Sequence, residues 1–338
     1  HLASAIVAIL VIALAGLHLL GPALEVGEFG LRLLGEEIVG QTDGELSFVR
    51  QLLDHRIVFG IILKSAAGID SAQVDAELLA AHVAGVDRGR LAVLDVPGPP
   101  DFEARYRDLV DARARRIPLQ HLTGLAPFGP LMLHVGPGVF IPRPETEAML
   151  EWCMKALADH HDPTIVDLCT GSGALAVALA RHRPDATVVA VDDSPVALGY
   201  ATRNAAGTSV QVVEADITAP EAGRLRPDLD GRIDLLVCNP PYIPEAAELE
   251  PEVAGHDPHH ALFGGPDGMA VIPAVVSLAV RWLRPGGAFA VEHDDTTSAR
   301  TVELITRTGL FDDVTARADL AGRPRFVTAT RQEGEPNS

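Results

Sequence analysis

The amino-acid sequence predicts an α/β protein with a largely parallel, doubly wound sheet, preceded by a small helical domain. From Thr164 onward, short β-branched segments alternate with helical patterns, which is the spacing of βαβ units. Ahead of them, residues 65–125 carry helical patterns only. The chain has 338 residues, enough for about two domains, and is 47% apolar, so each domain can bury a core.

The first 64 residues differ in composition from the rest. Residues 2–24 carry no formal charge, and residues 5–17 are apolar on every helical face. A run of about 18 or more apolar residues is a candidate membrane-spanning helix. We expect residues 1–64 to be an atypical extension: a membrane anchor through 2–24, a buried helix, or a gene-model artefact foreign to the functional protein.

Residues 65–125 are expected to form a small helical domain that docks a substrate. Asp70 and Gln73 have the spacing of a helix cap, and Val74 and Leu78 continue at helical spacing. A second helix is expected near Asp101. Four arginines on its other side are interpreted as a solvated face in preference to a partner-binding patch; they are Arg105, Arg113, Arg115 and Arg116.

Residues 126–147 are predicted to be a β-hairpin linker. Two short β-like runs, 131–135 and 139–141, are separated by Gly136-Pro137-Gly138. The segment from Pro142 to Glu147 then opens a helix that runs to about Asp159, because proline and acidic residues suit a first helical turn.

The main domain is expected over residues 148–331, followed by a tail at 332–338. Its predicted strands are 164–168, 187–192, 210–214, 233–238, 288–292, 314–318 and 325–330. Only residues 319–324 separate the last two strands, which is too short for a crossover helix. These two strands should therefore form an antiparallel hairpin at the edge of the sheet.

Charge and composition exclude several classes of function. With 27 basic and 46 acidic residues the net charge is −19, and aromatic residues make up 4%. Such a chain would repel a phosphate backbone and lacks a base-stacking platform, so no direct nucleic-acid binding is expected. The three cysteines form no C-x-x-C pair, which argues against a disulfide framework or a cysteine zinc site and favours the reducing cytoplasm.

A glycine loop follows the first strand of the main domain. It reads Cys169-Thr170-Gly171-Ser172-Gly173 and lies where open α/β sheets bind ligands. No Lys-Ser or Lys-Thr pair follows, so it is not a P-loop, and Ala176 occupies the place of the third glycine of a dinucleotide fingerprint. Alone, the loop could also be a tight strand–helix turn.

Acidic residues follow the next two strands. Asp192 ends the second strand, where a carboxylate can bind ribose hydroxyls. Asp216 follows the third strand, where it could accept from an adenine amino group beside Ile217. Together with the glycine loop, these acids favour a nucleoside cofactor without a pyrophosphate, and S-adenosylmethionine in preference to NAD.

The fourth strand ends in Asn239-Pro240-Pro241-Tyr242. The prolines remove two backbone donors, which leaves the Asn239 side chain and the Pro240 carbonyl as acceptors at the carboxyl edge of the sheet. A planar NH₂ group could donate both hydrogens there, with Tyr242 as a flat surface beside it. The alternative interpretation is a simple turn after a strand.

These motifs resemble the peptide chain release factor glutamine methyltransferase family, over about residues 65–331. Further motifs that carry the resemblance lie at 118–124, 141–147, 259–268 and 283–287. The resemblance implies a helical N-terminal domain, a hairpin linker and a seven-stranded, Rossmann-like class I methyltransferase domain. It also implies S-adenosylmethionine as cofactor and the glutamine of the Gly-Gly-Gln loop in class 1 release factors as substrate. We expect the enzyme to be monomeric.

The resemblance also implies roles for individual residues. The loop 169–173 would line the methionine part of the cofactor, Asp192 would hold the ribose, and Asp216 and Ile217 would lie at the adenine. Residues 239–242 would hold the substrate amide, with Asn239, Pro240 and Tyr242 as the catalytic residues, and Asn239 would also contact the cofactor. Arg143 and Glu145 receive no firm role. Cys169 departs from the pattern, since glycine is common at its position, and residues 1–64 do not resemble the family.

Two alternatives stay open. Another Asn-Pro-Pro-Tyr methyltransferase could act on a ribosomal-protein glutamine or on an adenine amino group, although the acidic charge argues against DNA. A membrane-tethered module could bind cofactor without activity, which the intact Asn239 motif opposes. His256, His259 and His260 are a weak metal template, and no metal is expected. The segment from Glu292 to Asp295 is interpreted as a solvated strand end.

Overall fold

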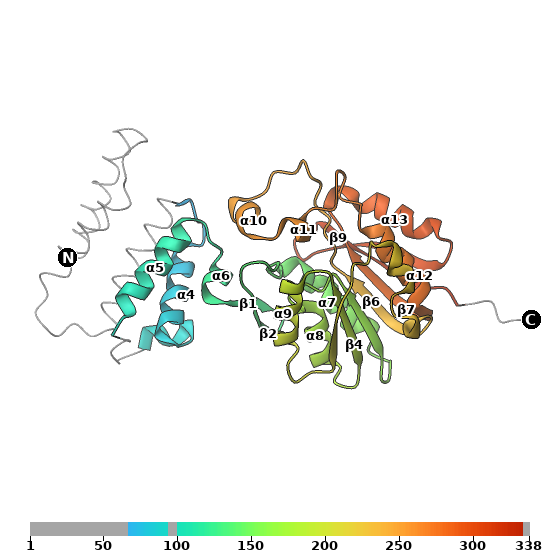
Figure 1. Cartoon of the computed structure of the whole chain (residues 1–338), viewed down its shortest axis with the longest axis horizontal. Coiled ribbons are helices and arrows are strands. Elements are labelled where there is room, and N and C mark those ends of the chain that lie inside the picture. Colours follow the sequence, from blue (N-terminus) through green and yellow to red (C-terminus); the bar gives the residue numbers. More distant parts are fainter. Residues whose placement is uncertain (1–66, 94–99, 334–338) are drawn as a thin grey trace, which may run out of the picture.

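A computed structural model describes residues 67–93 and 100–333 (Figure 1). The atypical extension 1–64, with the candidate membrane span at 2–24, lies outside the described residues. Within the two described ranges, no helix has the length and apolar character needed to cross a membrane.

The helical domain consists of α4 (Ala72–Ala84), η1 (Arg88–Val93), α5 (Phe102–Ala114) and α6 (Leu119–Thr123). Leu79 of α4 and Tyr106 of α5 are fully buried in its core. The cap predicted at Asp70 is wrong, because Ser71 precedes α4 and makes no side-chain capping bond. The predicted apolar face is also displaced, since Val74 is 39% exposed while Asp75 is buried beside Leu79.

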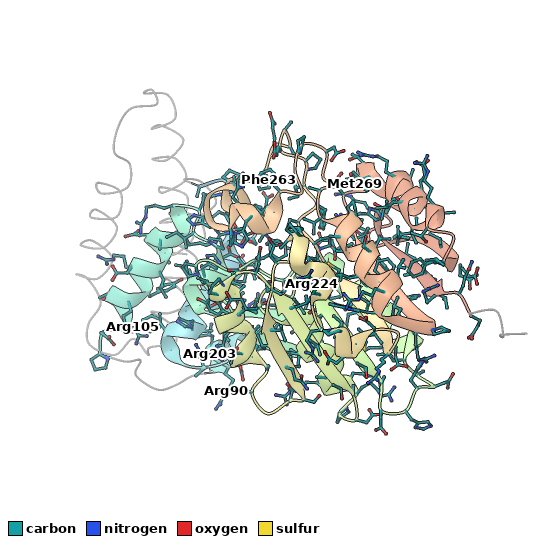
Figure 2. All side chains as sticks on the ribbon, turned by 45° about the vertical axis from the view of Figure 1, so that its right-hand side comes forward. Arg90, Arg105, Arg203, Arg224, Phe263 and Met269 are labelled. Atoms are coloured by element: carbon teal, nitrogen blue, oxygen red, sulfur yellow. The ribbon has the colours of Figure 1, made fainter. Side chains whose placement is uncertain are left out.

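The interpretation of the α5 arginines as a solvated face is wrong for Arg113. Its guanidinium is buried, with Nε 2.7 Å from Asp75 Oδ2 and Nη2 3.0 Å from Glu252 Oε1. Glu252 lies on α10 (Pro251–His256), which follows the Asn-Pro-Pro-Tyr segment in the chain. A buried ion network therefore ties the helical domain to the sheet domain, whereas Arg105 extends outward into solvent (Figure 2).

A hairpin joins the two domains, as expected, but its strands differ from the prediction. The strands β1 (Leu125–Phe128) and β2 (Leu131–His134) pair antiparallel around a turn at Gly129, whose φ is +52°. Residues 139–141 are not a strand. Val139 and Ile141 are buried because they pack against α9 (Pro195–Asn204), so their apolar pattern reflects tertiary packing rather than strand pairing.

The next predicted helix begins later than expected. The 3₁₀ turn η2 (Pro144–Thr146) precedes α7 (Glu147–Ala156). This turn brings Thr146 into the interior, where the side chain is 4% exposed.

The sheet has seven strands in the order β5-β4-β3-β6-β7-β9-β8, which confirms the predicted fold class. Strands β3 to β7 run parallel, and β9 runs antiparallel to both β7 and β8. Their bounds are β3 Thr164–Leu168, β4 Thr187–Asp192, β5 Val210–Glu214, β6 Ile233–Cys238, β7 Leu283–Glu292, β8 Phe311–Ala318 and β9 Pro324–Arg331. The last two strands form the predicted edge hairpin.

Helices cover both faces of the sheet (Figure 1). The helices α12 (Ile272–Trp282) and α13 (Ser298–Arg307) pack on the face that carries Val166 of β3. The helices α7 and α8 (Ala174–His182) pack on the face that carries Ile165, because successive strand residues point to opposite sides. Shorter elements complete the domain: η3 (Pro220–Arg224), η4 (Pro227–Leu229), α11 (His259–Leu262) and η5 (Asp295–Thr297).

Candidate active site

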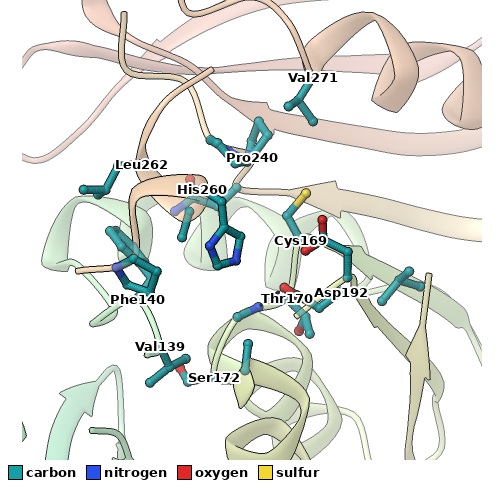
Figure 3. Close-up of a pocket in the computed structure, with 18 of the residues that line it drawn as sticks. Val139, Phe140, Cys169, Thr170, Ser172, Asp192, Pro240, His260, Leu262 and Val271 are labelled. Carbon is teal, nitrogen blue, oxygen red and sulfur yellow. Dashed lines mark hydrogen bonds between the residues drawn. The ribbon is translucent and has the colours of Figure 1, made fainter. Parts of the chain in front are cut away.

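The carboxyl ends of β3, β4, β5 and β6 surround a cavity (Figure 3). The lining includes almost all of the residues singled out from the sequence: Cys169, Thr170, Gly171, Ser172, Asp192, Asp216, Ile217, Asn239, Pro240, Pro241 and Tyr242. The exception is Gly173, the N-cap of α8, whose φ is +83°. A Cβ at Gly173 would lie 3.3 Å from Ala201 Cα, so this glycine lets α8 pack closely against α9.

Asp167, a residue of β3, fixes the glycine loop through hydrogen bonds. Its Oδ2 accepts from Thr170 Oγ1 at 2.5 Å and from Ala176 N at 3.1 Å, which fixes both the loop and the start of α8. The carboxyl is 1% exposed, and burial raises the pKa of Asp167 to about 7. Its Oδ1 lacks a hydrogen-bond partner among the described residues. Sequence reasoning gave Asp167 no role, although an acid inside a buried strand was a signal.

Two carboxylates stand on neighbouring strand ends. Asp192 accepts from Gly171 N at 2.8 Å and from Ser194 N at 3.0 Å, and desolvation raises its pKa. Asp216 is exposed and accepts from Thr218 N and Oγ1, which lower its pKa. The cavity therefore has acceptors at two points along one edge of the sheet.

The Asn-Pro-Pro-Tyr segment is clamped by the loop that follows α11. Ile243 N donates to Leu262 O at 2.9 Å, and Gly264 N donates to Ile243 O at 2.9 Å. A Cβ at Gly264 would lie 2.5 Å from Pro241 O, and one at Gly268 would lie 2.2 Å from Tyr242 O. Only glycine permits this approach of two backbones, so the loop fixes the positions of residues 239–242.

The interpretation of the segment that begins at Glu292 as a solvated strand end is wrong for Glu292 and His293. They are 1% and 0% exposed, because β7 is paired on both sides and the η2 turn covers its carboxyl end. Glu292 accepts from Thr146 Oγ1 at 2.8 Å and from Tyr242 Oη at 2.9 Å. Thr146 Oγ1 in turn accepts from Asn239 Nδ2 at 3.1 Å. Sequence reasoning assigned neither Glu292 nor Thr146 to the site.

The histidines and Arg143 occupy the rim. His260 of α11 lines the cavity (Figure 3). The ring of His259 instead packs on Phe263, with ring centroids 4.3 Å apart. In the part of the chain that the structure describes, no three His, Cys, Asp or Glu side chains are grouped to hold a metal. Arg143 pairs with Asp257 and stacks over Phe140, which joins the linker to the segment after α10.

This sheet order, with a glycine loop, strand-end acids and Asn-Pro-Pro-Tyr at one edge, defines a class I amino methyltransferase. A family model described as "PrmC N-terminal domain" matches residues 63–124, and one described as "Methyltransferase small domain" matches residues 132–254.

Relatives named "Release factor glutamine methyltransferase" cover most of the chain. The Mycobacterium tuberculosis protein is 64% identical over 287 residues, 84% of this chain and 91% of the relative. The Mycolicibacterium smegmatis protein is 68% identical over 267 residues, 79% of this chain and 93% of the relative. The Streptomyces coelicolor protein is 47% identical over 270 residues, which are 78% of this chain and 93% of the relative. The chain belongs to the release factor glutamine methyltransferase family, which confirms the resemblance seen in the sequence.

Proposed function

We propose that this protein transfers a methyl group from S-adenosylmethionine to the side-chain amide nitrogen of the Gly-Gly-Gln glutamine in a class 1 release factor. The observation that carries the proposal is the Asn239-Pro240 pair of acceptors on the wall of a cavity that also holds the glycine loop. The family membership supports the substrate.

The residues present fit the cofactor. Residues 169–173 would hold its methionine part, Asp192 its ribose, and Asp216 with Ile217 its adenine. Asp167 lines the same cavity, and its buried Oδ1, which has no hydrogen-bond partner within the described residues, suits a cationic ammonium group. When bound, S-adenosylmethionine supplies an electrophilic methyl group on a sulfonium.

The chain's own contribution is to orient a weak nucleophile. An amide nitrogen has a delocalised lone pair, so it must be held at about 3–3.5 Å from the methyl carbon and in line with the leaving sulfur. Asn239 Oδ1 and the Pro240 carbonyl would accept both amide hydrogens and favour a pyramidal nitrogen as charge develops. With the cofactor bound, the methyl group would pass to the amide nitrogen as its bond to sulfur breaks, and the surplus amide proton would leave to solvent.

We propose that the helical domain docks the release factor, because the Arg113 network joins it to α10, the helix that follows the substrate segment in the chain. The acidic composition and the free cysteines support a monomeric enzyme that works in the cytoplasm and binds no nucleic acid directly.

Transfer of label from S-adenosylmethionine to a purified release factor tests the proposal. We expect the full chain to label the wild-type release factor and not its Gly-Gly-Gln glutamine-to-alanine variant. The enzyme variant Asn239→Ala should lose labelling by about a hundredfold or more while still binding S-adenosylhomocysteine in calorimetry. Absence of label with intact cofactor binding would overturn the substrate assignment, and a ribosomal-protein glutamine would be tested next.

A further inference from the structure

The hydrogen-bond chain behind Asn239 has a defined polarity. It joins three segments that are distant in sequence: Thr146 from η2, Asn239 after β6, and Glu292 at the end of β7. We propose that Glu292 is a positioning residue that fixes which atom of the Asn239 carboxamide faces the substrate, and that it acts through the Thr146 hydroxyl. This inference rests on the proposed function.

The carboxylate of Glu292 determines the direction of the hydrogen bonds in this chain. An ionised carboxylate only accepts hydrogen bonds, and a hydroxyl has a single hydrogen to donate. Thr146 Oγ1 gives its hydrogen to Glu292 Oε2 at 2.8 Å, so toward Asn239 it can only accept. The carboxamide must then present Nδ2 to Thr146, at 3.1 Å, which leaves Oδ1 for the cavity.

The other carboxylate oxygen of Glu292 also accepts a hydrogen bond. Tyr242 Oη donates to Oε1 at 2.9 Å. Burial and the neighbouring carboxylate raise the pKa of Tyr242, so the phenol keeps its hydrogen and donates. Glu292 thus holds both ends of the Asn-Pro-Pro-Tyr segment, the amide acceptor at Asn239 and the ring of Tyr242.

Oδ1 and Nδ2 differ in what they can offer a substrate. An amide NH₂ from the substrate needs an acceptor at this position, which Oδ1 provides. A flipped carboxamide would present Nδ2, and two donors would then face each other across the cavity. Because such a mismatch leaves buried polar hydrogens unpaired, it costs affinity and alignment.

Protonation of Glu292 would remove the constraint. A neutral carboxyl can donate to Thr146, whose hydroxyl is then free to donate to Asn239 Oδ1 and stabilise the flipped orientation. Burial raises the pKa of Glu292 to about 7, aided by the Glu145 carboxylate and opposed by Thr146, Tyr242 and Arg325. Two further titratable groups lie near it: Cys238 of β6, whose pKa Glu292 helps to raise, and His293, which follows it directly in the chain. Methyl transfer should therefore decline as the pH falls below about 7.

Matched variants of the full chain test this role. In Glu292→Gln and Thr146→Val, kcat should fall by about tenfold to a hundredfold while the Kd for S-adenosylhomocysteine stays within about twofold. Thr146→Ser, which restores the hydroxyl, should recover most of the activity. The control Thr301→Val deletes another fully buried hydroxyl, one that donates to Thr297 O, and should leave kcat within about twofold.

The pH profile separates positioning from a merely structural role. The wild-type kcat should show an acid limb near pH 7, and Glu292→Gln should lack that limb. An unchanged limb in Glu292→Gln, or near-normal kcat in Thr146→Val, would overturn the inference.

A second readout does not depend on the release factor. The ¹⁵N and ¹H resonances of the Asn239 carboxamide, assigned by their absence in Asn239→Ala, should titrate near pH 7 in the wild type and not in Glu292→Gln. If the wild type fails to methylate a release factor, this titration still decides the inference. Resonances that do not titrate in the wild type would overturn it.

Discussion

The buried pair Arg113–Asp75 gives a sharp test of how the helical domain is held together. Both side chains are 5% exposed, and their Nε–Oδ2 distance is 2.7 Å. The guanidinium also donates to Ile117 O at 3.2 Å and lies 3.0 Å from Glu252, so all of its faces are partnered. Asp75→Ala removes one of these partners and leaves a buried cation with the partly exposed carboxylate of Glu252 as its nearest counter-charge.

Removing one partner of a buried ion pair lowers the free energy of unfolding by about 3–5 kcal/mol. Because the contact with Glu252 survives, we expect Asp75→Ala to lie at the lower end, about 3 kcal/mol. Glu252→Ala should cost about 1 kcal/mol or less, since its side chain is 26% exposed. The double variant Asp75→Leu/Arg113→Met should recover most of the loss, because two apolar groups replace two charges. Urea unfolding and hydrogen exchange of α4 and α5 measure these differences. A loss below about 1 kcal/mol for Asp75→Ala would refute the reasoning.

Three further predictions follow from the site. Cys169→Gly should raise the free energy of unfolding by about 1 kcal/mol, since Cys169 has a φ of +53° that glycine adopts freely; an unchanged melting temperature would contradict this. Gly268→Ala should lower kcat/KM by about tenfold or more, because its Cβ would force back the Tyr242 carbonyl; full activity would show that the clamp yields. Asp167 binds its proton more tightly in the folded state, so wild-type stability should fall as the pH rises from about 4 to about 7; Asp167→Asn should lose this slope in urea titrations.

The sequence was sufficient for the strands and for the loops at their carboxyl ends. Strands buried on both faces appear as short apolar runs, and the residues that end them, such as Asp192 and Asn239, share one edge of the sheet by topology alone. The edge hairpin of β8 and β9 followed from the short connection between them.

The errors concern side chains whose partners lie far along the chain. Arg113 pairs with Glu252, and Thr146 with Glu292, across 146 residues in the second case. Nothing local distinguishes such residues from solvated ones. The prediction of a linker strand at 139–141 is wrong for the same reason, because its apolar residues are buried by α9 rather than by a neighbouring strand.

The three cysteines differ in exposure, so alkylation of one of them can be used to follow ligand binding. Cys153 and Cys238 are buried, and burial raises the pKa of each thiol, so both are poor nucleophiles toward an added alkylating reagent. Cys169 alone of the three is partly exposed, and it faces the cavity. The rate at which Cys169 is alkylated should therefore report the fraction of protein molecules whose cavity is occupied. This measurement needs no labelled ligand, no affinity tag and no catalytic turnover.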